Sequence, residues 1–304
     1  MDLVTVPFRV PLNTRFRRVT ERAGVLLQGP EGWGEFSPFP EYPDDVAHRW
    51  WLAALEAATV AWPPPVRTSI PVNVTIPAVE PQEAHERVRA SGCTTAKVKV
   101  AEGDDAGRLE AVRDALGPGG KLRIDANGAW DAATAIREIK RFSHLDLEYV
   151  EQPCGSTEDL AAVRKAVDVP IAADESIRLA PDPMEVVRKE AADVAILKVQ
   201  PLGGVLRSLE LAERLGLPAV VSSALETSVG IAAGLHLAAC LPELPFACGL
   251  GTVALLEHDV VAEPLLPVDG AIVLRRPEPD LDLVGDPAGS DELTDRLERA
   301  MATG

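Results

Sequence analysis

Short apolar runs alternate with longer amphipathic runs between about residue 70 and residue 250, and this alternation constrains the fold more than any other feature. Runs such as AKVKV, LRIDAN and VAILKVQ are short and rich in branched apolar residues, as in strands buried in a parallel sheet. The runs between them have helical spacing, and PQEAHERVRASG ends on a glycine, Gly92, suited to a helix C-terminus. Eight strands with a crossover between each pair predict an α/β fold with a parallel sheet closed as a barrel.

The segments outside this alternation follow a different pattern. The first 36 residues are typical of antiparallel strands joined at the turn GPEG, and the helix DDVAHRWWLAALEAATV follows them. After residue 262 a proline-rich stretch leads to the helix DELTDRLERAM, which we expect to pack on the N-terminal segment or on the outside of the barrel. An open doubly wound sheet is the structural alternative to the barrel, although no G-x-G-x-x-G follows the first strand.

Charged residues stand one or two at a time at the ends of successive predicted strands. They are Lys97 and Lys99 on AKVKV, Asp125 on LRIDAN, Glu151 on LEYVEQP, Asp174 on PIAADES and Lys198 on VAILKVQ. The carboxyl ends of barrel strands converge on one mouth, so these side chains are expected to meet there. Any one of them alone is more often a loop residue, a helix N-cap or half of a surface ion pair. Five successive strands that end in this way favour a functional site.

The three acids in this series predict a metal site. Asp125, Glu151 and Asp174 come from three consecutive predicted strands and supply only oxygen ligands. Such ligands suit a hard cation, Mg²⁺ or Mn²⁺, with positions left open for substrate oxygens. Without a cation, three converging carboxylates would repel one another and raise one another's pKa.

The charge balance narrows the range of partners. The 304 residues include 30 basic and 47 acidic ones, for a formal net charge of −17, which repels nucleic acid and anionic lipid. An anionic substrate is still allowed, because a bound divalent cation can dominate the local field. We therefore expect a small-molecule carboxylate as the partner, with no nucleic acid and no membrane. The oligomeric state is left open, and a monomer is among the options.

The cysteines and the apolar stretches bear on the compartment. Cys93, Cys154, Cys240 and Cys248 form no C-x-x-C and no metal-ligand spacing, so we expect reduced and mostly buried thiols. The first residues lack the uninterrupted apolar core of a signal peptide. The longest weakly polar stretch, VGIAAGLHLAACL, is too short to span a bilayer. The expected location is cytoplasmic.

The motifs of the predicted mouth resemble those of the enolase superfamily and, within it, of the muconate-cycloisomerase-like subgroup. The matching motifs are the K-x-K of Lys97 and Lys99, DANGAW from Asp125, EQP from Glu151, ADES with Asp174, L-K at Lys198 and GWGE at residues 32–35. The resemblance extends over nearly the full length. It implies a (β/α)8-type barrel, modified as (β/α)7β, over residues 69–261, and an α+β capping domain formed by residues 1–68 plus 262–304.

The resemblance also implies the chemistry of the site. Members of this superfamily use a Lys or His base with one or two Mg²⁺ to remove a proton next to a carboxylate, through an enediolate. The three acids named above would hold Mg²⁺, for which Mn²⁺ could substitute. Lys99 would be the base, its pKa lowered by the charge of Lys97, and Lys198 would act from the opposite side. Lys97 and Asn127 are expected among the residues that bind the substrate.

Two residue types are missing at the ends of the predicted seventh and eighth strands, and their absence limits the reactions that the site could catalyse. Mandelate-racemase-like members need a His base after the seventh strand, and VVSSALETS contains none. Dipeptide epimerases show an Asp-x-Asp near the eighth strand, and FACGLGTVAL has no acid. The compact length, the short LNTRFRR loop and the SSALETS segment most resemble those superfamily members that dehydrate a cyclohexadiene carboxylate, and this resemblance implies a syn dehydration that forms an aromatic ring. The alternatives are an N-acylamino acid racemase or muconate-type cycloisomerase in the same superfamily and, from a different functional class, a non-catalytic barrel that binds metal-chelated acids.

The loop after the seventh strand holds candidates for contacts with a second substrate carboxylate. Ser222, Ser223 and the backbone N–H groups near Glu226 could bind it, helped by the N-terminus of the following helix. The two serines could equally do no more than turn the loop. The arginines of LNTRFRR could approach an anionic substrate from above, but at least two of them are expected on a solvated strand face.

Overall fold

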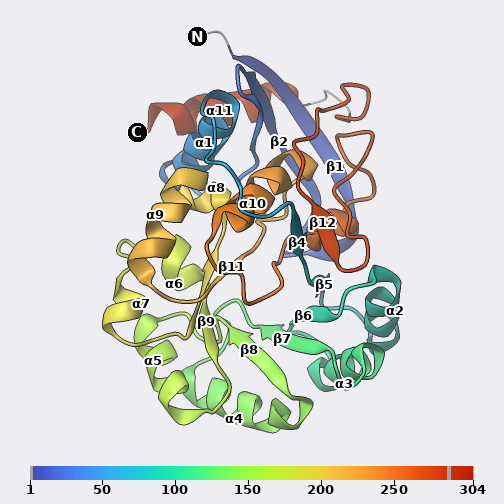
Figure 1. The fold of residues 1–304 in the computed structure, drawn as a ribbon, viewed down its shortest axis with the longest axis vertical. Helices are drawn as coiled ribbons and strands as arrows, with labels where there is room; N and C mark the ends of the chain where they lie inside the picture. Colours follow the sequence, from blue (N-terminus) through green and yellow to red (C-terminus); the bar gives the residue numbers. More distant parts are fainter. Residues whose placement is uncertain (1–2, 286–288, 304) are drawn as a thin grey trace.

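Seven parallel strands form one sheet in chain order in the computed structural model, which describes residues 3–285 and 289–303 (Figure 1). The strands are β5 (Val74–Ile76), β6 (Thr95–Lys99), β7 (Lys121–Asp125), β8 (Leu147–Glu151), β9 (Ile171–Ala173), β10 (Val194–Leu197) and β11 (Ala219–Val221). Every residue of β9, β10 and β11 is buried, as expected of parallel strands covered on both faces. The apolar runs of the sequence predict this sheet.

The segment around Cys248 closes the sheet into a barrel. Cys248 forms a parallel bridge with Val72 on one side, and Gly249 forms one with Ser222 on the other. Backbone hydrogen bonds of 2.7 and 2.8 Å join the segment to its two neighbours. The predicted barrel is therefore confirmed, but its last strand, expected over FACGLGT, is reduced to these bridges.

Helices connect most successive strands of the barrel and cover its outside. They are α2 (Pro81–Ser91), α3 (Asp105–Leu116), α4 (Ala132–Phe142), α5 (Thr157–Ala166), α9 (Val205–Leu215) and α10 (Ser228–Cys240), with short turns α6 (Glu175–Arg178), α7 (Glu185–Arg188), α8 (Val199–Leu202), η1 (Ser143–Leu145) and η2 (Gly251–Leu255). Gly92 ends α2 at a φ of +67°, in agreement with the prediction. One of the amphipathic runs between the strands, DPMEVVRKEA, forms only the four-residue α7 instead of a full helix, because Glu190 soon turns the chain with a φ of +51°.

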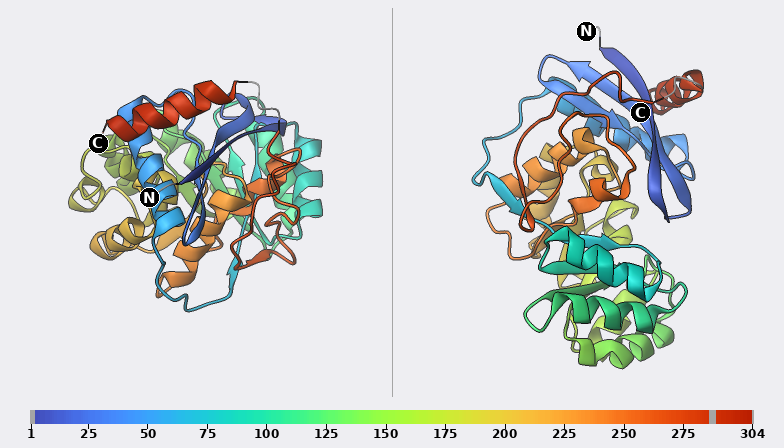
Figure 2. Two further views of the ribbon diagram at one scale, coloured as in Figure 1. Left: turned by 90° about the horizontal axis from the view of Figure 1, so that it is seen from above. Right: turned by 90° about the vertical axis from the view of Figure 1, so that its right-hand side faces the viewer.

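A second unit, which we call the cap, lies over one end of the barrel (Figures 1 and 2). It comprises the antiparallel strands β1 (Val4–Phe16), β2 (Val19–Gly29) and β3 (Gly32–Phe36) with the helices α1 (Asp44–Thr59) and α11 (Ser290–Ala302). Side chains alternate across the sheet: Val25 and Leu27 pack with both helices, whereas Leu26 between them packs in the main core. A short pair of strands, β4 (Ser69–Pro71) with β12 (Ala271–Val273), joins the segment after α1 to the segment before α11. The domain boundaries given above stay a prediction.

Buried polar side chains join the cap to the barrel, and we call this group the cap–barrel cluster. Its members are Arg22, Glu35 and Ser37 from the cap and Gln200, Glu226 and Thr227 from the barrel, each at most 3% exposed. The Glu35 carboxylate accepts a hydrogen bond of 2.6 Å from the Thr227 hydroxyl, and Arg22 donates one of 2.8 Å to the Leu225 carbonyl. Buried polar groups cost free energy when they lose their partners, so the cluster favours a single placement of the cap.

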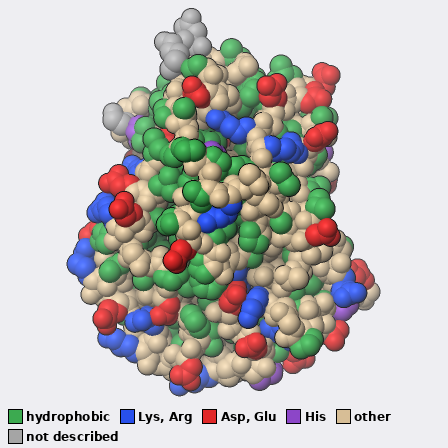
Figure 3. All heavy atoms as spheres, in the orientation of Figure 1, with side chains coloured by type: hydrophobic (Ala, Val, Ile, Leu, Met, Phe, Trp, Pro, Cys, Tyr) green, Lys and Arg blue, Asp and Glu red, His purple; other side chains and the backbone are tan. Residues whose placement is uncertain are grey.

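The face shown in Figure 3 carries both signs of charge, and most of the thiols are buried. Acidic and basic side chains are interspersed over the face shown in Figure 3. Within residues 3–285 and 289–303, no helix is long and apolar enough to cross a membrane. All four cysteines are free, and Cys93, Cys154 and Cys248 are buried, which confirms the expectation of mostly buried thiols.

The cap–barrel cluster makes the stability of the protein depend on pH. Burial and the nearby charge of Glu35 raise the pKa of Glu226 from its ordinary value of 4.5 to about 7. The stability that such a carboxyl contributes is fully present below pH 4.5 and is lost as the pH rises through 7. The loss amounts to about 3 kcal/mol at most.

We predict that Glu226→Gln has a higher free energy of unfolding than the wild type at pH 8, because the amide cannot ionise. The difference is expected to be smaller at pH 5. Denaturant titrations at the two pH values measure it, and Glu298→Gln, an exposed carboxyl of α11, controls for the simple loss of a charge. A Glu226→Gln variant less stable than the wild type at pH 8 would contradict the prediction.

Candidate active site

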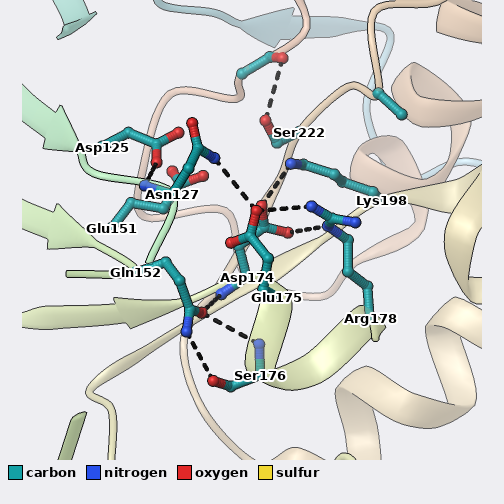
Figure 4. Close-up of polar contacts among 12 residues, drawn as sticks. Asp125, Asn127, Glu151, Gln152, Asp174, Glu175, Ser176, Arg178, Lys198 and Ser222 are labelled. Carbon is teal, nitrogen blue, oxygen red and sulfur yellow. Dashed lines mark hydrogen bonds and ion pairs between the residues drawn. The ribbon is translucent and has the colours of Figure 1, made fainter. Parts of the chain in front are cut away.

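The charged side chains at the ends of β6 to β10 converge in the mouth of the barrel, and Figure 4 shows those that follow β7 to β10. Lys99 is the register partner of Asp125, which in turn pairs with Glu151 on the next strand. Asp174 and Lys198 directly follow β9 and β10. The three acids are 0% exposed. The convergence expected from the sequence is therefore present, and it brings together groups that lie up to about a hundred residues apart along the chain.

Lys97 lies between two of the acids. Its ammonium nitrogen is 2.8 Å from the nearer Glu151 oxygen and 3.4 Å from Asp125 Oδ2. Burial acts to lower the pKa of Lys97, but the charges of Glu151 and Asp125 outweigh it and hold the pKa above its usual range. Burial and the charge of Asp125 together raise the pKa of Glu151. Lys97 therefore stays protonated and is suited to hold charge rather than to exchange a proton.

Lys99 has different surroundings from Lys97, although both belong to β6. Its nitrogen is 2.5 Å from Asp125 Oδ2 and 2.7 Å from Asn127 Oδ1, and the side chain is 15% exposed. Burial lowers the pKa of Lys99, and the charges of Lys97 and Lys198 add to this effect against the opposing charge of Asp125. Of the two lysines on this strand, Lys99 is thus the one that gives up a proton more readily.

Two cations hold Asp174. Its Oδ1 accepts a hydrogen bond of 2.9 Å from Arg178 Nε, and its Oδ2 one of 2.6 Å from Lys198 Nζ. Burial acts to raise the pKa of Asp174, but the charges of Arg178 and Lys198 hold it well below its usual range. Arg178 also reaches the cap, where it donates to the Tyr42 hydroxyl at 2.8 Å.

Sequence reasoning missed several residues that support the mouth. Gln152 accepts from the backbone N–H of Asp174 at 2.9 Å and donates to the Ser176 hydroxyl at 2.7 Å, which fixes the loop after β9 (Figure 4). Glu175 receives hydrogen bonds from Arg178 and from Asn127. Gln152 and Glu175 lie inside the EQP and ADES motifs, so their position in these motifs could have identified them as site residues. Arg178 just beyond ADES carried no signal of its own.

The acids of the mouth have the chemistry of metal ligands, but in this structure they are paired with basic side chains. Among the residues that the structure describes, no three His, Cys, Asp or Glu side chains are arranged as a metal-binding group. Nitrogens of lysine and arginine lie 2.5 to 2.9 Å from oxygens of Asp125, Glu151 and Asp174, and Lys97 lies within 3.4 Å of both Asp125 and Glu151. The chemistry of the set nevertheless fits a hard divalent cation: all three acids are buried carboxylates on neighbouring strands. In addition, Oε2 of Glu175 is buried without a hydrogen-bond partner in the described part of the chain.

A cavity lies above these charges, between the barrel and the cap. From the barrel it is lined by Lys97, Lys99, Asn127, Lys198, Ser222 and Ser223, and from the cap by Phe16, Arg17 and Phe39. Strands β6 and β10 are four positions apart in an eight-position barrel, so Lys99 and Lys198 reach the cavity from opposite sides. A wider groove shares Phe16, Arg17, Lys99 and Asn127 with this cavity and leads outward under the turn between β1 and β2. A small molecule in the cavity would lie between the two lysines.

The N-terminus of α10 is not free to bind a substrate carboxylate, which corrects the expectation from the sequence. The N–H groups of Thr227, Ser228, Val229 and Gly230 all donate to acceptors of the protein itself. Two buried carboxylates, Glu35 from the cap and Asp259 from the segment after η2, account for three of these four bonds. The N–H of Ala224 donates to the Glu226 carboxylate, so the backbone near Glu226 is engaged as well.

The serine hydroxyls remain candidates for substrate contacts. Ser223 Oγ lies 2.6 Å from Thr252 Oγ1, Ser222 Oγ lies 3.4 Å from the Gly249 carbonyl oxygen, and both serines line the cavity. Among the arginines, Arg15 and Arg18 are exposed, in agreement with the expectation for two of the three. Arg17 instead stacks on Phe39, with its guanidinium carbon 4.6 Å from the ring centroid, and reaches the cavity.

Comparison with known proteins gave matches over most of the chain. The family described as Enolase C-terminal domain-like matches residues 80–279, and that described as Enolase N-terminal domain-like matches residues 7–58. The curated o-succinylbenzoate synthase of Thermobifida fusca (strain YX) is 61% identical over 274 residues, or 88% of this chain and 86% of the relative. That of Mycobacterium tuberculosis (strain ATCC 25618 / H37Rv) is 51% identical over 89% of this chain and 84% of the relative.

The solved structures agree with the fold. The L-Ala-D/L-Glu epimerase from Bacillus subtilis, solved with a substrate ligand, superposes with a TM-score of 0.78 at 24% identity. The match covers 92% of this chain and 97% of that protein, so the barrel and the cap share its arrangement. At 24% identity, this structural similarity supports the fold alone. Together with the two family matches and the curated relatives, it shows that the chain belongs to the enolase superfamily, in the family that includes these o-succinylbenzoate synthases.

Proposed function

We propose that the chain is an o-succinylbenzoate synthase, which removes water from 2-succinyl-6-hydroxy-2,4-cyclohexadiene-1-carboxylate to form o-succinylbenzoate. The observation that carries the proposal is the 61% identity to the T. fusca synthase over most of both chains. The enzyme would be a carbon–oxygen lyase of menaquinone biosynthesis. Two further observations support it: the loop after β11 holds no histidine, and the segment after Cys248 holds no Asp-x-Asp for a substrate ammonium group.

Lys99 would act as the base. In this role its neutral amine takes the proton from the ring carbon that bears the carboxylate, and the ring electrons expel the hydroxyl group from the neighbouring carbon. The proton then passes to the departing hydroxyl, so the products are o-succinylbenzoate and one water. The lowered pKa of Lys99 supports this assignment, because a base must be partly neutral at working pH. A syn elimination suits one group that serves both steps from a single face of the ring.

Lys198 would face the other side of the ring. It contributes positive charge near the carboxylate on which negative charge develops, and its bond to Asp174 holds it in place. Lys97 and Asn127 would contact the substrate or orient Lys99, since both line the same cavity. Ser222 and Ser223 would meet the succinyl end, on the side of the cavity away from Asn127.

Asp125, Glu151 and Asp174 would hold the divalent cation, Mg²⁺ or in its place Mn²⁺. When bound, the cation stabilises the negative charge that develops on the substrate carboxylate. The three buried acids and the partly exposed Glu175 are paired with four basic side chains, Lys97, Lys99, Lys198 and Arg178. A divalent cation would add two positive charges, which the carboxylates of the substrate would offset.

The placement of the lysines also favours a second candidate, N-acylamino acid racemase activity. Lys99 and Lys198 reach the cavity from opposite sides, so each could exchange a proton with one face of an α-carbon. Incubation of the protein with an N-succinyl amino acid in D₂O, followed by NMR of the α-position, tests this. Deuterium exchange without any dehydration of the diene would replace the first proposal by the second.

The two lysines are expected to respond differently to arginine. Lys99→Arg should lose as much kcat/KM as Lys99→Ala, about 10³-fold, because a guanidinium does not act as a base near neutral pH. Lys198→Arg keeps the charge and should retain clearly more activity than Lys198→Ala, although the larger group disturbs the fit. Ultraviolet assay of o-succinylbenzoate formation measures all four variants.

Lys121→Ala is the matched control for these variants, since Lys121 is an exposed lysine at the opposite end of β7. It should keep the wild-type kcat/KM. Turnover that survives in Lys99→Arg would rule out Lys99 as the base, and full activity in Lys198→Arg would contradict a close contact between Lys198 and the substrate.

Metal removal is expected to abolish the activity. Exhaustive chelation should leave no measurable o-succinylbenzoate formation, and added Mg²⁺ should restore it. Asp125→Asn should weaken Mg²⁺ binding in calorimetry, because a neutral amide replaces one of three buried carboxylates. Undiminished activity after chelation would refute the assignment of the three acids.

A further inference from the structure

Glu35, the acid of the GWGE segment, has no part in the proposed chemistry, yet its carboxylate is 3% exposed and fully engaged. Its Oε2 accepts hydrogen bonds from the Thr227 hydroxyl at 2.6 Å, the Thr227 N–H at 3.1 Å and the Gly230 N–H at 3.0 Å. Its Oε1 accepts one of 2.6 Å from the Ser37 hydroxyl. Burial raises the pKa of Glu35, while the hydrogen bonds from Ser37 and Thr227 and the helix N-terminus act against this effect and favour the charged form. Glu35 therefore ties the start of α10 to the cap.

Arg22 ties the loop before α10 to the same part of the cap. Its Nε donates to the Leu225 carbonyl at 2.8 Å, and its guanidinium carbon lies 4.2 Å from the centroid of the Phe39 ring. Leu225 has a φ of +65°, a conformation that persists in a leucine only where the surroundings hold it. Leu225 and Phe39 both line the cavity, one from the barrel and one from the cap. The cap–barrel cluster therefore positions residues on two sides of the cavity, Leu225 on the barrel side and Phe39 on the cap side.

The cluster also reaches the loop that carries Lys198. Gln200 lies two residues beyond this lysine, and its Oε1 accepts a hydrogen bond of 3.3 Å from the Ser37 backbone N–H. Ser37 in turn donates to Glu35. The cap therefore holds the loops after β10 and β11 through one continuous set of buried hydrogen bonds.

We infer that Glu35 is a positioning residue for substrate binding. It holds the loop over residues 222–227 so that Ser222, Ser223 and Leu225 form the wall against which the succinyl end of the substrate lies. The inference rests on the proposed function, because it assigns the loop to the part of that substrate farthest from the reacting carbon. Glu35 itself touches neither the cavity nor the lysines, and its effect passes through Thr227 and the loop.

Glu35→Gln tests the inference with little change in shape. The amide oxygen can still accept the bonds from Thr227 and Gly230, but it is a weaker acceptor than a carboxylate, and the amide nitrogen cannot accept the bond from the Ser37 hydroxyl, so the loop loses part of its anchor. We expect KM for the diene and Kd for o-succinylbenzoate to rise about tenfold, with kcat changed less than about threefold, because the loop contacts ground state and transition state alike. Steady-state kinetics and calorimetry with the product measure these quantities.

Asp259→Asn is the matched control. Asp259 is also a buried carboxylate at the N-terminus of α10, with hydrogen bonds from Ser228 and Val260, but it does not bond to the loop before Thr227. Both variants should lower the melting temperature. Only Glu35→Gln should raise KM and Kd, while Asp259→Asn should keep both within about twofold of the wild type.

Equal KM values in the two variants would overturn the inference and leave the proposed function standing, as would a Glu35→Gln variant that loses kcat alone. A folded wild-type protein that neither converts the diene nor binds o-succinylbenzoate would overturn the proposed function and, with it, the inference.

Discussion

The balance of buried charge in the barrel mouth is the constraint on which the rest of the structure depends. Four acids and four cations meet there with little access to water, and each acid has at least one cation within hydrogen-bond distance. Removing one partner of such a pair costs about 3 to 5 kcal/mol, because the other charge stays buried. The strands must therefore end in register, so that Lys99, Asp125 and Glu151 lie side by side. A bound divalent cation would shift this balance, and an anionic substrate would offset the shift.

The cap completes this arrangement by closing the mouth and by holding the loops around it. Tyr42 bonds to Arg178 and so links the cap to the acid pair after β9, while Glu35 and Arg22 hold the loop after β11. The aromatic rings of Phe16 and Phe39 cover the cavity from above. Chemistry and recognition are thus divided: the strand ends supply charge, and the cap with the loop after β11 shapes the space around the substrate.

The sequence predicts the parts of the structure that have a local period. Apolar runs of a few residues identify the seven regular strands, and the position of each charged residue at a strand end predicts that they meet. The segment at Cys248 that closes the barrel pairs with its neighbours through single bridges. A segment this short has too few residues for its length to be predicted from an apolar run. The capping of α10 could not be predicted, because Glu35 and Thr227 are 192 residues apart and nothing local links them. A sequence does not show whether a helix N-terminus is free to bind a ligand, because a carboxylate far away along the chain can cap it in the fold.

The pairing of the acids with lysines could not be predicted from the sequence either, because the charges within a motif do not indicate which groups face each other in the fold.

The most direct test of the central claim is ultraviolet detection of o-succinylbenzoate formed from the cyclohexadiene carboxylate by the purified protein with Mg²⁺. The proposed function predicts that o-succinylbenzoate accumulates at a rate proportional to the amount of protein and that it is the only organic product. A folded protein that leaves the diene unchanged under these conditions would contradict it.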